Sequence, residues 1–223
     1  MTSRPTAARL ARDLRLYALT ADGGARDPAG KTRVRAWLEA GVRAVQLRET
    51  QLPPDQVVGF GRFLRAVTAE YGALLIVNDD PQLAQLIEAD GCHLGQEDMR
   101  PALARKILGP EKLIGLSTHS RAEVLTAAEK GVDYIGVGPI FQSSTKDVGR
   151  ALLGPEFAGW AAARSGLPVV AIGGVTLDNV GQLVAAGCPS VAVLGALNQP
   201  PEPGAAARAF LEALSPRDSA PLP

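Results

Sequence analysis

Residues 168–196 read PVVAIGGVTLDNVGQLVAAGCPSVAVLGA, and this stretch decides the fold class. Its two ends, 168–174 and 190–196, are short runs of branched and small apolar residues of the kind that form fully buried strands. The segment between them has the spacing of a helix and ends in a glycine, which can adopt the left-handed conformation that closes a helix. Two buried strands joined by a helical crossover are expected to lie parallel in one sheet.

The same unit of strand, helix and glycine recurs along the rest of the chain. Helical segments that end in glycine include PDQVVGFGRFLRAVTAEYG, PQLAQLIEADG and RAEVLTAAEKG. Eight units of about 20 to 30 residues fit a closed (β/α)8 TIM barrel, an α/β fold, better than an open doubly wound sheet. The apolar runs that we expect to be strands are 14–20, 44–49, 74–79, 91–96, 113–118, 134–139, 168–174 and 190–196.

The length of the chain favours a single domain. Barrels of roughly 200 to 250 residues form one unit, and this chain has 223 residues. We therefore expect residues 13–213 to form one barrel with the catalytic site. Residues 1–12 carry no apolar period and are predicted to be a flexible N-terminal extension, and the Pro-rich segment 214–223 is predicted to be a disordered tail.

Composition excludes several classes of partner. Lys and Arg together number 23, as do Asp and Glu, so no overall charge attracts nucleic acid or an anionic membrane. Cys92 and Cys188 lie among small residues, which indicates buried packing rather than redox or metal chemistry. No apolar run approaches the ~20 residues that span a bilayer, and the N-terminus lacks a signal-peptide core. A cytoplasmic location is expected.

In such a barrel the loops after the C-terminal ends of the strands build the active site. The second apolar run ends in QLRE, where alternation along a strand places Gln46 and Arg48 on one side. The guanidinium of Arg48 offers a fixed fork of donors that suits a diphosphate. An ion pair of Arg48 with Glu49 or with a helix is the alternative interpretation.

Carboxylates follow the third and fourth apolar runs. Asp80 stands before Pro81 and is explained as a helix N-cap, which leaves Asp79 without a structural role. Asp98 closes the motif HLGQED one unit later. Mg2+ binds few protein carboxylates and takes its other ligands from water and phosphate. We therefore predict that Asp79 and Asp98 hold Mg2+.

Other polar residues divide into structural and functional groups. His93 and His119 are the only histidines, too few for a multi-histidine zinc site, and we interpret each as a hydrogen-bonded structural residue. Ser120 and Glu123 have the spacing of a capping box. Ser117 is free to bind a phosphate or a ring group, and no histidine and aspartate at recognisable spacing make it a nucleophile.

Two further segments indicate a phosphate site. The loop 138–146 carries hydroxyl groups and Lys146, whose ammonium can neutralise a leaving diphosphate. Glycines follow the seventh and eighth runs at 173–174 and at Gly195, where bare backbone N–H groups can approach a phosphate. Barrels of this class often place a phosphate at these two strand ends.

Taken in order, VQLRE, VNDD, HLGQED, GLSTH, GPIFQSSTK, AIGGV and VAVLGA resemble the motifs of the thiamine-phosphate synthase family over residues 14–197. The resemblance implies Mg2+-dependent transfer of the 4-amino-2-methylpyrimidin-5-ylmethyl group from its diphosphate to a thiazole phosphate. The products would be thiamine phosphate and diphosphate, formed by a dissociative mechanism with a carbocation-like intermediate. The expected partners are these two small molecules, and a homo-oligomer is left open.

The resemblance also implies roles for single residues. Asp79 and Asp98 would hold Mg2+, and Arg48, Lys146 and Ser117 would be catalytic, acting on the diphosphate side. The substrate-binding residues would be Gln46, Leu47, Arg48, Glu49, Thr50, Asn78, Ser117, Ser143, Ser144, Thr145, Lys146, Gly174, Leu194 and Gly195. Of these, Gln46, Arg48 and Asn78 would contact the pyrimidine substrate, and Ser143, Ser144, Thr145, Gly174, Leu194 and Gly195 would bind the thiazole phosphate.

The sequence departs from the family at two positions, where Thr50 replaces the usual Lys and Gly195 the usual Ser. Thr50 removes a charge from the expected diphosphate site. One alternative function is a thiazole tautomerase of the same barrel family, which needs a histidine but no metal, and Gly195 and His119 favour it. Asp79 and Asp98 favour the synthase. A phosphate-binding barrel without catalysis is the second alternative.

Overall fold

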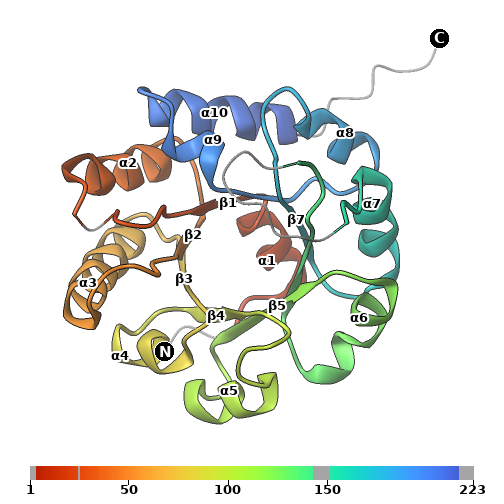
Figure 1. Ribbon diagram of the computed structural model, residues 1–223, viewed down its shortest axis with the longest axis horizontal. Helices are drawn as coiled ribbons and strands as arrows, with labels where there is room; N and C mark the ends of the chain where they lie inside the picture. The colour runs from red at the N-terminus through yellow and green to blue at the C-terminus, as the bar shows by residue number, and fades with distance from the viewer. Residues whose placement is uncertain (1–3, 25, 143–150, 216–223) are drawn as a thin grey trace.

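The structure of the chain, a computed structural model, describes residues 4–24, 26–142 and 151–215. Parallel strands close into a barrel in the order β1 to β8, and β8 pairs back onto β1 (Figure 1). The predicted (β/α)8 barrel is confirmed, and each strand lies inside the run predicted for it. The strands are β1 (Leu16–Leu19), β2 (Ala44–Leu47), β3 (Leu74–Asn78), β4 (Gly91–Leu94), β5 (Leu113–Thr118), β6 (Tyr134–Val137), β7 (Val169–Ile172) and β8 (Val191–Val193).

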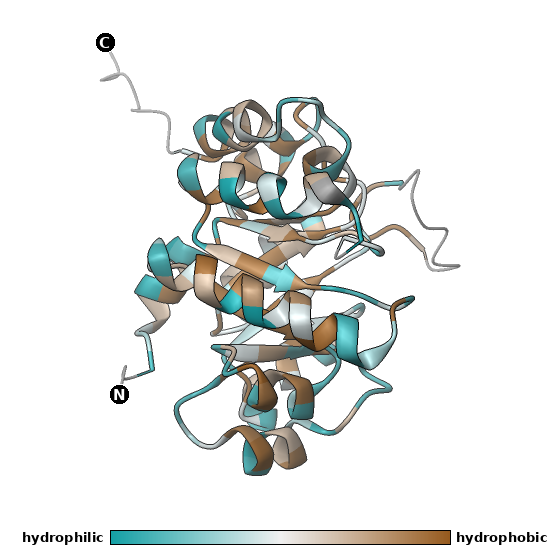
Figure 2. Ribbon diagram, turned by 90° about the vertical axis from the view of Figure 1, so that its left-hand side faces the viewer, coloured by the Kyte–Doolittle hydropathy of each residue, from teal (hydrophilic) through white to brown (hydrophobic). Residues whose placement is uncertain are grey.

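Helices surround the ring of strands (Figure 1), and in the side view of Figure 2 they lie on opposite sides of it. Six of them begin on proline, whose missing N–H is no loss in the first turn. No helix in the described ranges is long and apolar enough to cross a membrane. The helices are α1 (Ala7–Asp13), α2 (Pro28–Glu39), α3 (Pro54–Glu70), α4 (Pro81–Leu86), α5 (Pro101–Leu108), α6 (Arg121–Thr126), the 3-10 helix η1 (Ala128–Lys130), α7 (Pro155–Arg164), α8 (Val180–Ala185), α9 (Gly195–Asn198) and α10 (Pro203–Leu214).

The apolar core forms two layers. The larger layer lies between the strands and the outer helices and includes the fully buried Trp37 and Leu64. The smaller layer fills the inside of the barrel. Its buried members are Leu10, Leu14, Tyr17, Leu19, Ala44, Leu74, Ile76, Leu113, Tyr134, Val170 and Ala192.

The first helix corrects one expectation from the sequence. Residues 1–12 were expected to be a flexible extension, but α1 begins at Ala7 with Thr6 as its N-cap. Leu10 and Leu14 are only 2% and 0% exposed because both pack into the inner layer, at the end of the barrel where the strands begin. A short helix with one leucine inside it and one at its C-cap gives little periodicity in sequence. It is stabilised by the tertiary contact rather than by its own propensity.

Candidate active site at the carboxyl ends of the strands

A cavity of about 120 Å3 opens where the strands end. Polar residues from β2, β3, β4 and β5 meet there above an apolar floor. Four of the residues predicted from sequence line it, and so does His93, for which only a structural role was expected. The lining residues are Leu19, Gln46, Arg48, Asn78, His93, Ser117, Tyr134, Gly136, Val170, Ile172 and Ala192.

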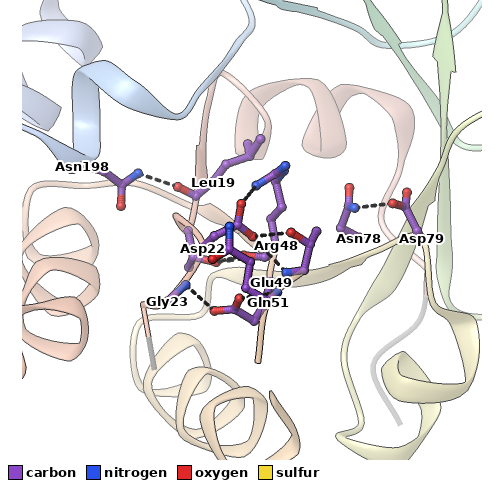
Figure 3. Close-up of polar contacts among 11 residues, drawn as sticks. Leu19, Asp22, Gly23, Arg48, Glu49, Gln51, Asn78, Asp79 and Asn198 are labelled. Carbon is purple, nitrogen blue, oxygen red and sulfur yellow. Dashed lines mark hydrogen bonds and ion pairs between the residues drawn. The ribbon is translucent and has the colours of Figure 1, made fainter. Parts of the chain in front are cut away.

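Arg48 is fixed at the edge of the cavity by Asp22, which lies in the loop after β1 (Figure 3). Arg48 Nη1 donates to Asp22 Oδ2 at 2.7 Å, and Asp22 Oδ1 accepts from the backbone N and the hydroxyl of Thr50, both at 2.9 Å. Burial raises the pKa of Asp22, but the hydrogen bonds from Arg48 and Thr50 outweigh burial and lower it. Asp22 is thus an anion that orients the guanidinium.

Leu47 and Glu49, on either side of Arg48 in sequence, make structural contacts. Glu49 is not its ion-pair partner, because Glu49 Oε2 accepts from the backbone N of Gly23 at 2.7 Å and so holds the loop after β1 (Figure 3). The Leu47 side chain is 1% exposed and packs in the outer core layer. Any contact of Leu47 with a substrate would therefore come from its backbone.

Asp79 and Asp98 come together at the ends of β3 and β4. Asp79 has a left-handed backbone, with φ of 63°, and its N donates to His93 O at 2.8 Å. Asp79 Oδ2 accepts from Asn78 Nδ2 at 2.5 Å (Figure 3), and Asp98 Oδ2 accepts from Gly95 N at 2.6 Å. A left-handed backbone is uncommon for a residue other than glycine. The Asp79 carboxyl group lies within hydrogen-bonding reach of the Asp98 carboxyl group.

The surroundings of Asp79 favour its protonated form. Partial burial and then the adjacent Asp98 carboxylate raise the pKa of Asp79 to about 7, against the lowering effects of Asn78 and Arg48. Two carboxyl groups held at one rim can share a cation, and oxygen ligands suit Mg2+. No cluster of three metal-binding side chains occurs in the ranges that the structure describes. A site with two carboxylates fits a metal that takes its remaining ligands from substrate and water.

His93 and Ser117 belong to a buried hydrogen-bonded chain. His93 Nδ1 lies 3.1 Å from Tyr134 Oη, and His93 Nε2 lies 3.0 Å from Ser117 Oγ. Tyr134 Oη lies 3.2 Å from Tyr17 Oη, which in turn accepts from Gln46 Nε2 at 2.9 Å. Burial lowers the pKa of His93 to about 4, although Asp98 opposes this, so the imidazole is neutral at pH 7. The interpretation of His93 as hydrogen-bonded is confirmed.

The glycines after β7 bring the loop after β6 to the same mouth. Phe141 N donates to Gly173 O at 3.0 Å, and Ile140 N donates to Ile172 O at 2.9 Å. Gly174 has φ of 61°, and a Cβ there would lie 2.2 Å from Gln142 O, so no other residue fits. The residues predicted next in this loop, Ser143, Ser144, Thr145 and Lys146, lie outside the described residues.

The end of β8 is closed by a short helix. Gly195 is the first residue of α9, and Leu194 precedes it as the N-cap. Asn198 Nδ2 donates to Leu194 O and to Leu19 O, both at 2.8 Å, which ties this end to β1. The Leu194 side chain packs against the inner apolar layer. The backbone around Gly195 is thus held next to the cavity lining.

The polar residues that follow β3 and β5 and precede the next helices stabilise those helices. Asp80 Oδ1 accepts from Gln82 N and Leu83 N at 2.9 Å, which confirms it as the N-cap of α4. Ser120 Oγ accepts from Glu123 N at 3.2 Å. The return bond of this box goes one residue earlier than expected, from the backbone N of His119 to Glu123 Oε2.

Sequence reasoning missed several residues of the site, which are Asp22, Tyr17, Tyr134 and Gln96. Asp22 follows the first strand as Asp79 follows the third, so the same rule would have identified it. Tyr17 and Tyr134 gave no signal, because apolar residues surround them in strands that are buried on both faces. Gln96 Nε2 donates to the backbone O of Ser117 at 2.5 Å, a contact between loops that no spacing reveals.

Comparison with known proteins gives a consistent result. A family model described as thiamine monophosphate synthase matches residues 16–197. A thiamine-phosphate synthase of Dictyoglomus thermophilum is 40% identical over 185 residues, 83% of either chain, and one of Moorella thermoacetica is 41% identical over 182 residues, 82% of this chain and 87% of the other. The solved thiamine phosphate pyrophosphorylase of Pyrococcus furiosus has a TM-score of 0.83 at 33% identity, and the match covers 92% of this chain and 97% of that one.

Proposed function

Because this chain belongs to the thiamine monophosphate synthase family, and so is a transferase of thiamine biosynthesis, we propose in finer detail how its residues perform the reaction. The pyrimidine diphosphate lies in the cavity, and its pyrimidinylmethyl group passes to the ring nitrogen of a thiazole phosphate, with Mg2+ as the cofactor. The products are thiamine phosphate and diphosphate. The enzyme acts on these small molecules in the cytoplasm.

The observation that carries the proposal is the meeting of Asp79 and Asp98 beside an oriented Arg48. Burial and then the adjacent Asp98 carboxylate raise the pKa of Asp79, and this crowding of two carboxyl groups supports a cation between them and the substrate. A bound Mg2+ would neutralise charge on the leaving diphosphate. Arg48, held by Asp22, donates hydrogen bonds to the same diphosphate.

The other residues position the reactants. Gln46, Asn78 and Ser117 line the cavity and hold the pyrimidine ring. Lys146 neutralises the diphosphate, and the thiazole phosphate binds to Ser143, Ser144, Thr145, Gly174, Leu194 and Gly195.

A dissociative order of events suits this set of residues. The diphosphate leaves first, and the thiazole nitrogen captures the pyrimidinylmethyl cation, so no base has to remove a proton before the bond forms. Both ring nitrogens of His93 are already in hydrogen bonds with Tyr134 and Ser117, so His93 is not a free base at the cavity floor. Each electrostatic contact to the departing group is worth on the order of 3 kcal/mol of barrier.

One incubation tests the function. The chain is mixed with the pyrimidine diphosphate and the thiazole phosphate, with Mg2+ or with EDTA, and thiamine phosphate and diphosphate are measured. We expect both products with Mg2+ and neither with EDTA. Tautomerisation of a thiazole at the same rate with and without EDTA would identify the tautomerase instead. Binding of both substrates without turnover would identify a phosphate-binding barrel.

A further inference from the structure

The hydrogen-bonded chain through the barrel interior connects two sides of the cavity. It runs from Gln46 on β2 through Tyr17 on β1 and Tyr134 on β6 to His93 on β4, and ends at Ser117 on β5. Gln46, Tyr17 and Tyr134 are 4%, 2% and 0% exposed. Gln46 and Ser117, the two ends, both line the cavity.

Each phenol has one proton, so the direction of one bond fixes the direction of the next. Gln46 Nε2 donates to Tyr17, whose only other partner in the described ranges is Tyr134. Tyr17 therefore donates to Tyr134, and Tyr134 donates to His93 Nδ1. A neutral histidine that accepts at Nδ1 carries its proton on Nε2. His93 then donates to Ser117, whose own hydroxyl proton is left for the cavity.

The opposite order is also self-consistent, but only if every bond reverses together. Were the amide oxygen of Gln46 to face Tyr17, Tyr17 would donate to it, His93 would carry its proton on Nδ1, and Ser117 would donate to His93. In both orders, one end of the chain offers the cavity an acceptor and the other offers a donor. When Gln46 presents its amide oxygen, Ser117 presents a hydroxyl proton; when Gln46 presents its amide nitrogen, the Ser117 oxygen accepts. A mixed order would leave a buried phenol proton without an acceptor, and this unmet hydrogen bond disfavours it.

We propose that Tyr17, Tyr134 and His93 are positioning residues that form a one-way relay, which couples Gln46 as an acceptor to Ser117 as a donor across the cavity. An aminopyrimidine offers an exocyclic amine as donor and ring nitrogens as acceptors, so it matches this pair of atoms. The relay deepens the proposed function and rests on it for the identity of the ring. Its direction is a property of the protein without substrate.

Two glycines make room for the relay. A Cβ on Gly115 would lie 2.2 Å from Tyr134 Cζ and 2.4 Å from His93 Nδ1, and a Cβ on Gly136 would lie 3.1 Å from His93 Cε1. Strands β5 and β6 therefore carry no side chain at these two places inside the barrel. The space is taken by the tyrosine and histidine rings, whose centroids are 5.4 Å apart. The rings are held by packing as well as by hydrogen bonds.

The tautomer of His93 reports the direction of the relay. Nitrogen-15 NMR distinguishes a protonated from an unprotonated ring nitrogen, and the chain has only two histidines. His119 is an internal reference, because its Nδ1 lies 2.7 Å from Gly138 O and a carbonyl can only accept. In the substrate-free protein we expect His93 to carry its proton on Nε2 and His119 on Nδ1.

Gln46→Glu should reverse the relay. An ionised carboxylate can only accept, so Tyr17 must donate to it, and the His93 proton should move from Nε2 to Nδ1. The spectrum is recorded at a pH at which the carbon-13 shift of the new carboxyl shows it to be ionised. In a Tyr17→Phe background the same change should leave His93 unaltered. An unchanged His93 tautomer in Gln46→Glu, or a change that persists without the Tyr17 hydroxyl, overturns the relay.

Activity gives a second readout. Tyr134→Phe should raise the KM for the pyrimidine diphosphate about tenfold, the worth of one oriented hydrogen bond, and leave the KM for the thiazole phosphate unchanged. Tyr71→Phe, at the end of α3, removes a hydroxyl that lies 3.4 Å from Glu39 and serves as the control. Equal changes in both KM values overturn the positioning role. Absence of product from the parent enzyme would refute the proposed function while the NMR result stands.

Discussion

Replacing Asp79 by Asn should make the metal-free protein more stable and the enzyme inactive. Asn is the appropriate substitution because it tolerates the left-handed backbone of this position, where φ is 63°. It keeps the shape of the side chain, removes the charge and turns one acceptor oxygen into an amide donor. A gain in stability therefore reports the cost of placing a carboxylate in this partly buried position beside Asp98.

The magnitude follows from the pKa of Asp79, which is raised from 3.8 to about 7 by burial and by Asp98. Without screening, such a change corresponds to about 4 kcal/mol at neutral pH. The residue lies at an exposed rim, where solvent screens the repulsion, so we expect about 1 kcal/mol. For a chain of this size that is a rise in Tm of about 2 to 4 °C.

The pH dependence has a definite sign. Between about pH 4 and pH 7 the folded protein holds a proton on Asp79 that the unfolded chain has already lost. The free energy of unfolding of the metal-free protein should therefore fall as pH rises through this window, relative to Asp79→Asn. Thermal unfolding in EDTA at several pH values measures the difference, which should be largest above pH 7.

With Mg2+ bound, the parent protein should be more stable than Asp79→Asn, the reverse of their order without metal. A ligand at a hundred times its Kd stabilises the folded state by about 2.7 kcal/mol, so Mg2+ should raise the Tm of the parent and leave that of Asp79→Asn unchanged. Asp80→Asn is the matched control, because Asn caps a helix as well as Asp does, and its response to Mg2+ should equal that of the parent. A lower Tm for metal-free Asp79→Asn near pH 7.5, or an equal response of both proteins to Mg2+, would refute the reasoning.

Three further predictions concern the neighbours of this rim. Asp22→Asn should raise the KM for the pyrimidine diphosphate about tenfold or more, because Arg48 loses a charged partner at 2.7 Å; an unchanged KM in steady-state assays would show that Arg48 needs no orientation. Thr50→Lys should retain or raise turnover, because it restores a charge beside Asp22, and a collapse of kcat would mean that this site has diverged from the family. Gly174→Ala should lower the Tm and raise the KM for the thiazole phosphate, because its Cβ would meet Gln142 O at 2.2 Å; a variant with the Tm and KM of the parent would contradict the close approach.

The barrel could be predicted because its strands and helices alternate with glycine stops along the whole chain. Asp79 and Asp98 could be paired in advance because consecutive parallel strands place their ends side by side. The helix α1 could not be predicted, since its stability comes from Leu10 and Leu14 packing against strands far away in sequence. The fifth strand was predicted with its observed bounds. The other runs were predicted one to four residues too long, because residues next to a strand can continue its sequence pattern without its pairing.

The residues of the site that could not be predicted from sequence are those whose role depends on which face of a strand carries their side chains. In strands such as LYAL and YIGV every residue is buried, so alternation of polar and apolar residues is absent. Tyr17 and Tyr134 then look like ordinary core residues. Only closure of the barrel shows that both point inward, with their ring centroids 6.2 Å apart.

The placement of the tyrosines also shows how an apolar barrel can carry polar groups beneath the proposed substrate site. Barrel interiors are usually filled by branched aliphatic residues, and this chain has only three tyrosines, of which Tyr17 and Tyr134 stand inside the barrel. Phenol rings present apolar faces to the leucines beneath them, while their hydroxyl groups supply hydrogen bonds to the layer above. Leu10 and Leu14 close the layer from below. The apolar floor can therefore remain tightly packed while, within the described ranges, no buried side-chain nitrogen or oxygen lacks a hydrogen-bond partner.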